Sequence, residues 1–320
     1  MKRYFWNKEG SCMLSDLLTV VGQVATLFLM MGVGYVLTKI DWLSEETVSQ
    51  CTKFLLYVVC SCIVITRFQI EANAQIIRTM LMAIFGLLLP FVVMLPVIHL
   101  MFRKEAPDSK VVRRFGMVFP NGTLMGLPLL AGVLGDEAVI YGVLCLLVFS
   151  IIQWTYGIAT YGGTVSVRRM VINPGIISMG IGLVLFATGL RLPAPVYNAM
   201  DFLGSTNTPL GMVIIGSQMA RADILSALKA PKLYITAAVK LIVVPAVAVV
   251  GLLPFRMEPL TYCACVVLAA CPTGGTTSML AQMFKRDIPT AAQMVTLSTL
   301  LSIITLPIFA VIARQISGLA

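Results

Sequence analysis

The sequence predicts an all-α integral membrane protein with ten transmembrane helices, arranged as two inverted repeats of five helices each. Three observations lead to this prediction. The chain of 320 residues is 58% hydrophobic and only 12% charged, and its mean hydropathy is +0.94. Apolar runs long enough to cross a bilayer recur along its whole length. Landmarks of the first half also return in the same order in the second half.

The composition argues against several other classes of protein. A soluble domain carries about 25% charged residues, and the 12% found here is too little to cover a soluble surface. The net charge of +9 does not indicate nucleic-acid binding, because the Lys and Arg residues form short clusters between apolar runs, as in membrane loops. Most of the 8 cysteines lie within apolar runs, and His99 is the only histidine. We therefore expect no disulfide framework, no metal site and no cofactor.

A membrane span needs about 20 mostly apolar residues. The ten predicted spans cover residues 17–39, 51–70, 78–102, 111–134, 138–163, 174–191, 195–220, 231–253, 259–284 and 288–313. Residues 1–16 are polar, and we expect them to form a loose N-terminal extension, with one hypothesis placing the natural start at Met13. The first apolar run is too long for a signal peptide and lacks an evident small-residue cleavage site, so we interpret it as a transmembrane helix.

The positive charges predict the orientation in a cell membrane. The loops after spans 1, 3, 5, 7 and 9 hold 14 Lys and Arg residues, whereas the termini and the other loops hold 8. Because positively charged loops remain in the cytoplasm, both termini are predicted to lie outside. Lys2, Arg3 and Lys8 argue against this orientation. The remaining cation, Lys240, lies within span 8.

The two halves of the chain share three landmarks. The matching pairs are Pro96 with Pro245, Pro120 with Pro272, and Asp136 with Asp287. The predicted repeats cover residues 17–163 and 164–320. Each holds five spans, an odd number, so the second repeat must enter the membrane upside down relative to the first. Inverted repeats of this kind are typical of secondary transporters.

Proline, glycine and small polar residues interrupt two spans at matching positions of the repeats. The runs are Phe119 to Pro128 in span 4 and Ala270 to Ser278 in span 9. Proline and glycine weaken a helix, and the freed backbone groups must be satisfied by protein, water or ligand. Half-helix N-termini favour anions, and neither run contains a carboxylate. The alternative is a pair of kinked helices whose small residues serve only for packing.

We predict that these interruptions bind the substrate, with two further residues as candidates. The predicted binding residues are Pro120, Asn121, Gly122, Thr123, Pro272, Thr273, Gly274, Gly275, Thr276, Thr277, Asn207 and Lys240. Lys240 could hold a substrate carboxylate or contribute to coupling, or it could extend to the cytoplasmic interface. Asn207 lies in a third polar break, in span 7, where it could touch substrate or satisfy the kink.

Several motifs resemble those of the auxin efflux carrier family of membrane transporters. The motifs are the run from Asn121 to Pro128 with Gly135-Asp136 after it, Trp154-Thr155-Tyr156-Gly157, Asn173-Pro174, Pro209-Leu210-Gly211-Met212, and the stretch from Ser298 to Pro307. The resemblance extends over nearly the whole chain from Met13. One departure is Ser61, which stands where the family usually has a proline in span 2.

The resemblance implies a fold like that of the bile-acid sodium symporters, with spans 4 and 9 crossing as broken helices. Spans 3–5 and 8–10 would form a moving transport domain. Spans 1, 2, 6 and 7 would form a scaffold and a possible homodimer surface. The mechanism would be elevator-like, and the family's substrates are organic carboxylates such as malate, malonate and indole-acetic acid.

The leading hypothesis is therefore a secondary transporter of small organic anions in contact with membrane lipid. The coupling ion is left open between proton, sodium and none. An intramembrane enzyme is not expected, because the chain has neither a His-Glu-x-x-His motif nor paired intramembrane aspartates, and no Walker A motif indicates a nucleotide-driven engine. A membrane sensor that binds such a ligand without moving it is the alternative.

Overall fold

The computed structural model describes residues 2–163, 174–222 and 224–319, and the regular structure in these ranges is helical. The elements in the first part of the chain are α1 (Lys2–Lys39), α2 (Glu45–Phe54), η1 (Leu55–Val59), α3 (Cys60–Arg67), α4 (Ala74–Leu100), α5 (Pro107–Val118), η2 (Gly122–Gly126), α6 (Leu127–Leu134), η3 (Asp136–Ala138), α7 (Val139–Ile152), η4 (Gln153–Gly157) and α8 (Ile158–Thr160). Those after residue 173 are α10 (Pro174–Thr188), α11 (Ala194–Ser205), α12 (Asn207–Arg221), α13 (Ile224–Lys229), α14 (Pro231–Ala238), η5 (Val239–Val243), α15 (Val244–Leu252), η6 (Leu253–Phe255), α16 (Pro259–Ala270), α17 (Thr276–Met283) and α18 (Ile288–Ser317).

Six uninterrupted helical segments of the described chain are long and apolar enough to cross a membrane. They are Val20–Lys39, Glu45–Arg67, Ala74–Leu100, Asp136–Thr160, Pro231–Phe255 and Ile288–Ser317. The other four predicted spans, at 111–134, 174–191, 195–220 and 259–284, are shorter or divided. Six of the ten predicted spans are therefore long apolar helices, and the ten-helix arrangement is not confirmed. Three of the other four are divided at prolines or small polar residues, and the fourth, at 174–191, is a single short helix that ends at Thr188.

Span 7 is divided at Thr206, between α11 and α12. The hydroxyl groups of Ser205 and Thr206 donate to the carbonyl oxygens of Phe202 and Leu203, at 2.7 and 2.6 Å. Such local bonds compete with the helical backbone pattern. The break therefore follows from the polar run that the sequence places here, and it brings Asn207 to the start of α12.

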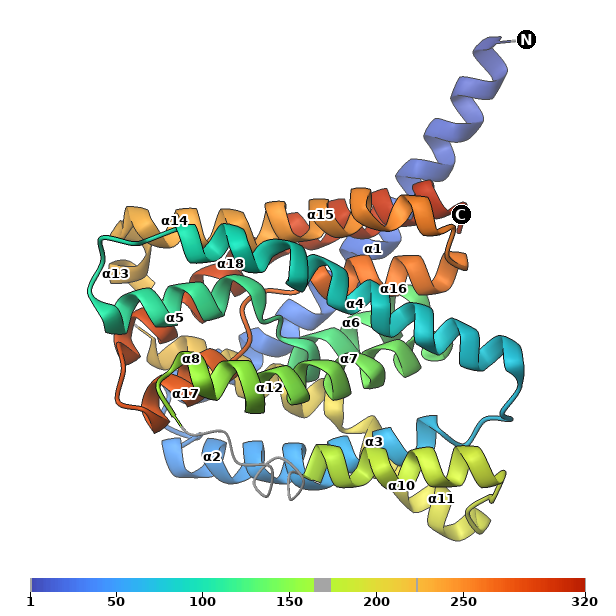
Figure 1. Cartoon of the computed structure of the whole chain (residues 1–320), viewed down its shortest axis with the longest axis horizontal. Coiled ribbons are helices and arrows are strands. Elements are labelled where there is room, and N and C mark those ends of the chain that lie inside the picture. The colour runs from blue at the N-terminus through green and yellow to red at the C-terminus, as the bar shows by residue number, and fades with distance from the viewer. Residues whose placement is uncertain (1, 164–173, 223, 320) are drawn as a thin grey trace.

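For reference, we divide the helices into two groups, which also contact each other where α1 packs against α18 and α6. The first helix group consists of α1, α2–α3 and α10–α12, and the second of α4–α8 and α14–α18. In the first group, α1 packs against α12, and α3 packs against α10 and α11. In the second, α16 packs against α18, α4 and α15. In Figure 1, α13 and the α4–α5 and α17–α18 connections lie at one end of the bundle, and both termini lie at the other.

The N-terminal residues differ from expectation. Residues 2–16 continue α1 as a helix instead of forming a loose segment, and this part of α1 projects from the bundle (Figure 1). Span 2 is also unbroken: the turn at Leu55–Val59, just before Ser61, is π-helical, and the helix continues to Arg67. A serine in place of proline leaves the backbone N–H that continues the helix.

Asp287 caps the N-terminus of α18. Its carboxylate accepts hydrogen bonds from the backbone N–H of Thr290 at 3.0 Å, the Thr290 hydroxyl at 2.8 Å and the Ser109 hydroxyl at 2.5 Å. The Ser109 bond ties α18 to α5. Burial alone would raise the pKa of the Asp287 carboxyl, but the bonds from Ser109 and Thr290 outweigh burial and hold the pKa below its usual value.

We expect Asp287→Ala to lower stability by about 1 kcal/mol at neutral pH, the usual cost of a lost cap. Because the folded-state pKa is depressed, this contribution is present above the unfolded-state pKa of about 4 and disappears as the pH falls through the folded-state value. Thermal unfolding of the purified protein in detergent across a pH series measures the difference. Glu71→Ala, which removes an exposed carboxylate, is the control. A deficit of the same size at every pH would contradict the prediction.

Candidate functional site

The two predicted interruptions lie against each other. The backbone between α5 and η2 pairs with the backbone between α16 and α17 in an antiparallel bridge of Pro120 with Thr273. The N–H of Asn121 donates to the Pro272 carbonyl oxygen at 2.8 Å, and the N–H of Gly274 donates to the Phe119 carbonyl oxygen at 3.0 Å. These two bonds satisfy backbone groups that the broken helices leave free. We call this contact the paired break.

Local sequence explains why each segment is extended here. Phe119 and Cys271 precede the two prolines and have ψ angles of 112° and 144°. A residue before proline is disfavoured in the helical region, so each helix ends at this point. A glycine is then needed for close approach: a Cβ at Gly274 would lie 2.8 Å from the Pro120 carbonyl oxygen.

Thr273 is an anchor of the paired break. Its backbone N–H donates to the Ser298 hydroxyl at 3.1 Å, and its own hydroxyl donates to the Gly116 carbonyl oxygen at 2.9 Å. It is buried. Thr273 therefore joins the α16–α17 connection to α5 and α18 at one point. The sequence did not single out Ser298 as a site residue; the signal that could have found it is a hydroxyl within an apolar span.

Other predicted residues retain unused hydrogen-bonding capacity. The Asn121 carbonyl oxygen accepts from the N–H groups of Met125 and Gly126, at 3.3 and 2.9 Å. The Asn121 side chain is 6% exposed, and its amide makes no hydrogen bond with any described residue. The buried hydroxyl oxygen of Thr277 likewise has no partner among the described residues. Buried polar groups are normally paired, so the unpaired side chains of these two residues are exceptions to that rule.

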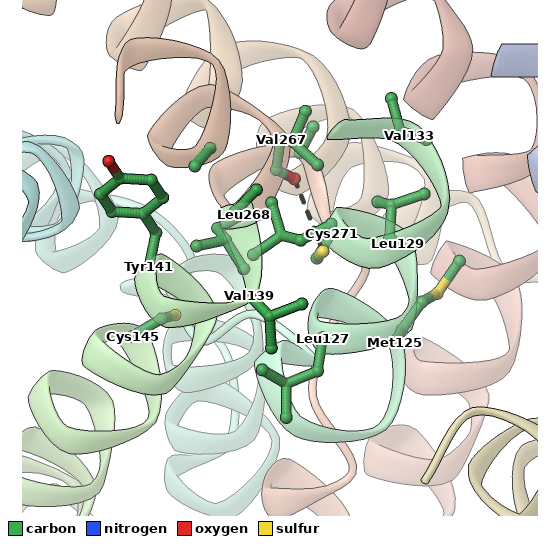
Figure 2. Packing of buried hydrophobic residues seen from close by; sticks show 14 of the residues in the cluster. Met125, Leu127, Leu129, Val133, Val139, Tyr141, Cys145, Val267, Leu268 and Cys271 are labelled. Atoms are coloured by element: carbon green, nitrogen blue, oxygen red, sulfur yellow. Dashed lines mark hydrogen bonds between the residues drawn. The ribbon is translucent and has the colours of Figure 1, made fainter. Parts of the chain in front are cut away.

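Apolar packing surrounds the Cys271 end of α16. Figure 2 shows Cys271 among side chains of α6, α7 and α16, with its thiol donating to the Val267 carbonyl oxygen at 3.5 Å. Cys271 belongs to the same buried cluster as Leu129, Val139 and Leu268. This packing holds the second interrupted helix against the first, and it leaves the thiol as a packing group.

Two of the clefts between the helix groups are lined by the segment Glu45–Arg67. The α17 cleft, of about 460 Å³, is lined by Glu45, Val48, Ser49, Thr52, Gln218, Arg221, Ala222, Gly275, Ser278, Met279, Gln282, Ala292, Val295 and Thr296. The α11 cleft, of about 470 Å³, is lined by Ile63, Thr66, Arg67, Leu127, Ala131, Asp136, Val139, Tyr197, Asp201, Gly204, Ser205, Asn207 and Thr208. The segment Glu45–Arg67 contributes its start to the first cleft and its end to the second. The clefts therefore open at opposite ends of the bundle.

The structure brings most of the predicted binding residues together. Those on either side of the paired break come from 120–123 and 272–277, and Gly275 also lines the α17 cleft. Asn207 lies elsewhere: it lines the α11 cleft, and the Cys60 thiol donates to its Oδ1 at 3.8 Å. Lys240 is fully buried, and its ammonium donates to the Ala269 carbonyl oxygen at 2.9 Å.

Polar lining residues of the α17 cleft were missed by the sequence analysis. Arg221 and Gln218, at the end of α12, face Ser278 across this cleft. Arg221 donates to the Leu43 carbonyl oxygen at 2.5 Å. In the sequence it counted only as a loop cation, since nothing local shows that the end of α12 meets α17. In the described ranges, no three His, Cys, Asp or Glu side chains gather as a metal site.

The apolar spans, the short helices and the paired break define the class: this is a multi-pass membrane protein built like a transporter. The chain belongs to the membrane transport protein family, the auxin efflux carrier family that its motifs resemble, whose model matches residues 19–163 and 163–310. No curated protein matches the chain. The family indicates a membrane transporter, and so a small-molecule substrate and a lipid environment.

Proposed function

We propose that this protein is a secondary transporter that moves small organic anions across the plasma membrane, with mono- or dicarboxylates such as malate or malonate, or auxin-like acids, as substrates. The observation that carries the proposal is the paired break, where Pro120 meets Thr273. A spanning protein rarely interrupts two helices at one place unless a cavity or ligand uses the freed backbone groups.

The proposed topology is two inverted five-helix repeats with broken crossover helices at spans 4 and 9. The interruptions fall at Pro120 and Pro272, which match under the repeat. Both termini lie at the end of the bundle opposite the α4–α5 and α17–α18 connections (Figure 1), as an even number of crossings requires. The excess of Lys and Arg in these connections favours a cytoplasmic location for them, with both termini outside.

The proposed binding site uses the start of α17 and the unpaired groups beside the paired break. The Asn121 amide and the Thr277 hydroxyl lack partners among the described residues, so both can bind a carboxylate. Gly275 and Ser278, at the N-terminal end of α17, line the α17 cleft, where the helix dipole favours an anion. Gly122, Thr123 and Thr276 complete the proposed set.

The two clefts support an elevator mechanism. Each lies between the first helix group, the proposed scaffold, and the second, the proposed transport domain. Leu127 of the first interruption lines the α11 cleft, whereas Gly275 and Ser278 of the second line the α17 cleft. A displacement of the second group along the first would close the α17 cleft and expose the site through the α11 cleft. The scaffold helices α1–α3 and α10–α12 are the proposed homodimer surface.

Uptake into proteoliposomes tests the proposal. Purified protein is reconstituted and offered a panel of labelled mono- and dicarboxylates, with and without sodium or pH gradients. Protein-dependent accumulation of at least one acid is the expected result. The alternative, a sensor on the same fold, predicts that the protein binds an acid without moving it. Binding without flux for every acid would therefore reject transport.

Asn121→Ala should reduce this uptake by roughly ten- to hundredfold, because a hydrogen bond to a charged group contributes about 1.5–3 kcal/mol. Expression and thermal stability should be little changed, since the Asn121 amide bonds to no described residue. Asn198→Ala, on the exposed face of α11, is the matched control. Wild-type uptake by the Asn121 variant would remove that residue from the proposed site.

A further inference from the structure

Lys240 is a buried cation that the proposed binding site does not use. It lies in the π-helical turn η5, and none of its surface is exposed. An ammonium inside a membrane span is costly unless a partner compensates it. Its hydrogen-bond partner is the Ala269 carbonyl oxygen, at 2.9 Å, and it forms no ion pair with a described carboxylate.

The partner of Lys240 is the C-terminal end of α16, where the helix breaks. Here the last carbonyl groups of the helix have no backbone N–H donor within the helix. The Leu268 and Val267 carbonyl oxygens accept from the N–H and the thiol of Cys271, and the Ala269 carbonyl oxygen accepts from Lys240. Such half-helix C-termini carry partial negative charge and hold coupling cations in broken-helix transporters.

The corresponding place in the first repeat has no cation. Measured from the matched prolines Pro96 and Pro245, the counterpart of Lys240 is Phe91. Phe91 covers the end of α5, with its ring 5.6 Å from that of Phe119 and at 82° to it. The ends of the two half-helices are therefore covered differently, by an aromatic ring in one repeat and by an ammonium group in the other.

The space beside Lys240 is too small for a substrate. It measures about 10 Å³, is lined by Lys240, Phe91, Pro120 and other residues of the second helix group, and contains no carboxylate. This is about the space that one water occupies. Lys240 also lines neither of the clefts between the helix groups. It therefore lies beside Pro120 of the paired break and outside both clefts.

We infer that Lys240 is a tethered cation that takes the place of a coupling sodium ion at the C-terminal end of α16. The inference rests on the proposed function and specifies its coupling: the ammonium holds the negative end of α16 permanently compensated, so that binding and transport need no sodium. Lys240 is thus a positioning residue for the paired break and has no direct contact with substrate.

Two variants and two salts test this inference. Lys240→Met removes the charge and fills the space, whereas Lys240→Ser removes the charge and leaves a cavity with an added oxygen ligand beside the Ala269 carbonyl. Each purified protein is measured in sodium chloride and in choline chloride at equal ionic strength, by thermal unfolding in detergent and by uptake in proteoliposomes. Lys229→Ser, at an exposed position of α13, is the matched control.

Wild-type uptake and Tm should be the same in both salts. Lys240→Met should lose about tenfold or more of the uptake in either salt, the scale of one lost charge-assisted hydrogen bond. Lys240→Ser should lose as much in choline but recover in sodium, with a Tm higher by roughly 2–4 °C because sodium binds the folded state. Lys229→Ser should show no response to sodium.

Three results would overturn the inference: sodium-dependent uptake by the wild type, full uptake by Lys240→Met, or a Lys240→Ser variant that responds identically to both salts. If Lys240 had a merely structural role, the Lys240→Ser substitution would not make the protein respond to sodium. The unfolding measurement requires no substrate. It therefore tests the cation site even if no acid of the panel is carried, a result that would count against the proposed function alone.

Discussion

Gly34→Ala is expected to be among the most destabilising single-methyl substitutions in this chain. A Cβ at Gly34 would lie 2.1 Å from the Val213 carbonyl oxygen, which is backbone and cannot swing aside. The reciprocal contact is equally close, since a Cβ at Gly216 would lie 1.9 Å from the Met31 carbonyl oxygen. Small residues let two membrane helices approach at their backbones. The substitution must therefore push α1 and α12 apart, and we expect a cost of about 3 kcal/mol or more.

Gly32→Ala is the matched control for this prediction. It lies on the same helix two residues earlier, and a Cβ there would meet nothing within 4 Å. Thermal unfolding in detergent and the yield of monodisperse protein compare the two variants. We expect Gly32→Ala to match the wild type or to exceed it slightly, since alanine is the better helix former. Equal stability of the two alanine variants would show that Gly34 of α1 does not lie against the Val213 carbonyl oxygen of α12.

Gly274→Ala should impair both the stability of the paired break and transport. Its Cβ would lie 2.8 Å from the Pro120 carbonyl oxygen and 3.2 Å from the Thr276 hydroxyl. The Gly274 N–H bond to the Phe119 carbonyl oxygen would then lengthen or break. We expect a loss of about 1–3 kcal/mol in stability. If the paired break forms the transport site, uptake should separately fall by about tenfold, which corresponds to about 1.4 kcal/mol in the activation free energy of transport.

Gly275→Ala provides the comparison for stability, because a Cβ at Gly275 meets nothing within 4 Å. The two glycines are adjacent, so their local sequence and membrane depth are nearly the same. Melting temperatures and initial uptake rates are measured for both. A Gly274 variant as stable as the Gly275 variant would mean that the two interruptions do not approach as closely as the bridge of Pro120 with Thr273 requires.

Much of the fold follows from one-dimensional patterns. Hydropathy predicts the apolar helices because each must satisfy its own backbone in lipid. Pro120 and Pro272 predict where two of them break, and the breaks lie at these positions. The expectation of a loose N-terminal segment was wrong for residues 2–16, because polarity alone does not prevent a helix from continuing.

The site depends on contacts between distant segments that no local pattern encodes. That Thr273 bonds to Gly116 and Ser298 depends on how α5, α17 and α18 pack, since each residue alone is an ordinary small or polar residue in a span. The same holds for Lys240, whose depth the sequence shows but whose partner, Ala269, it does not.

The sequence by itself determined that this chain is a helical membrane protein, that it belongs with a family of transporters, and where two of its helices are interrupted. The apolar helices and their interruptions arise from the free-energy cost of placing charge and unpaired backbone groups in lipid. This cost depends on each residue's own side chain and backbone, so it can be read from the sequence. Tertiary structure alone decided that the two interruptions pair, that Thr273 anchors them and that Lys240 bonds to the Ala269 carbonyl oxygen beside them. Those outcomes depend on the close packing of several helices at once, which is a property of shape and not of local composition.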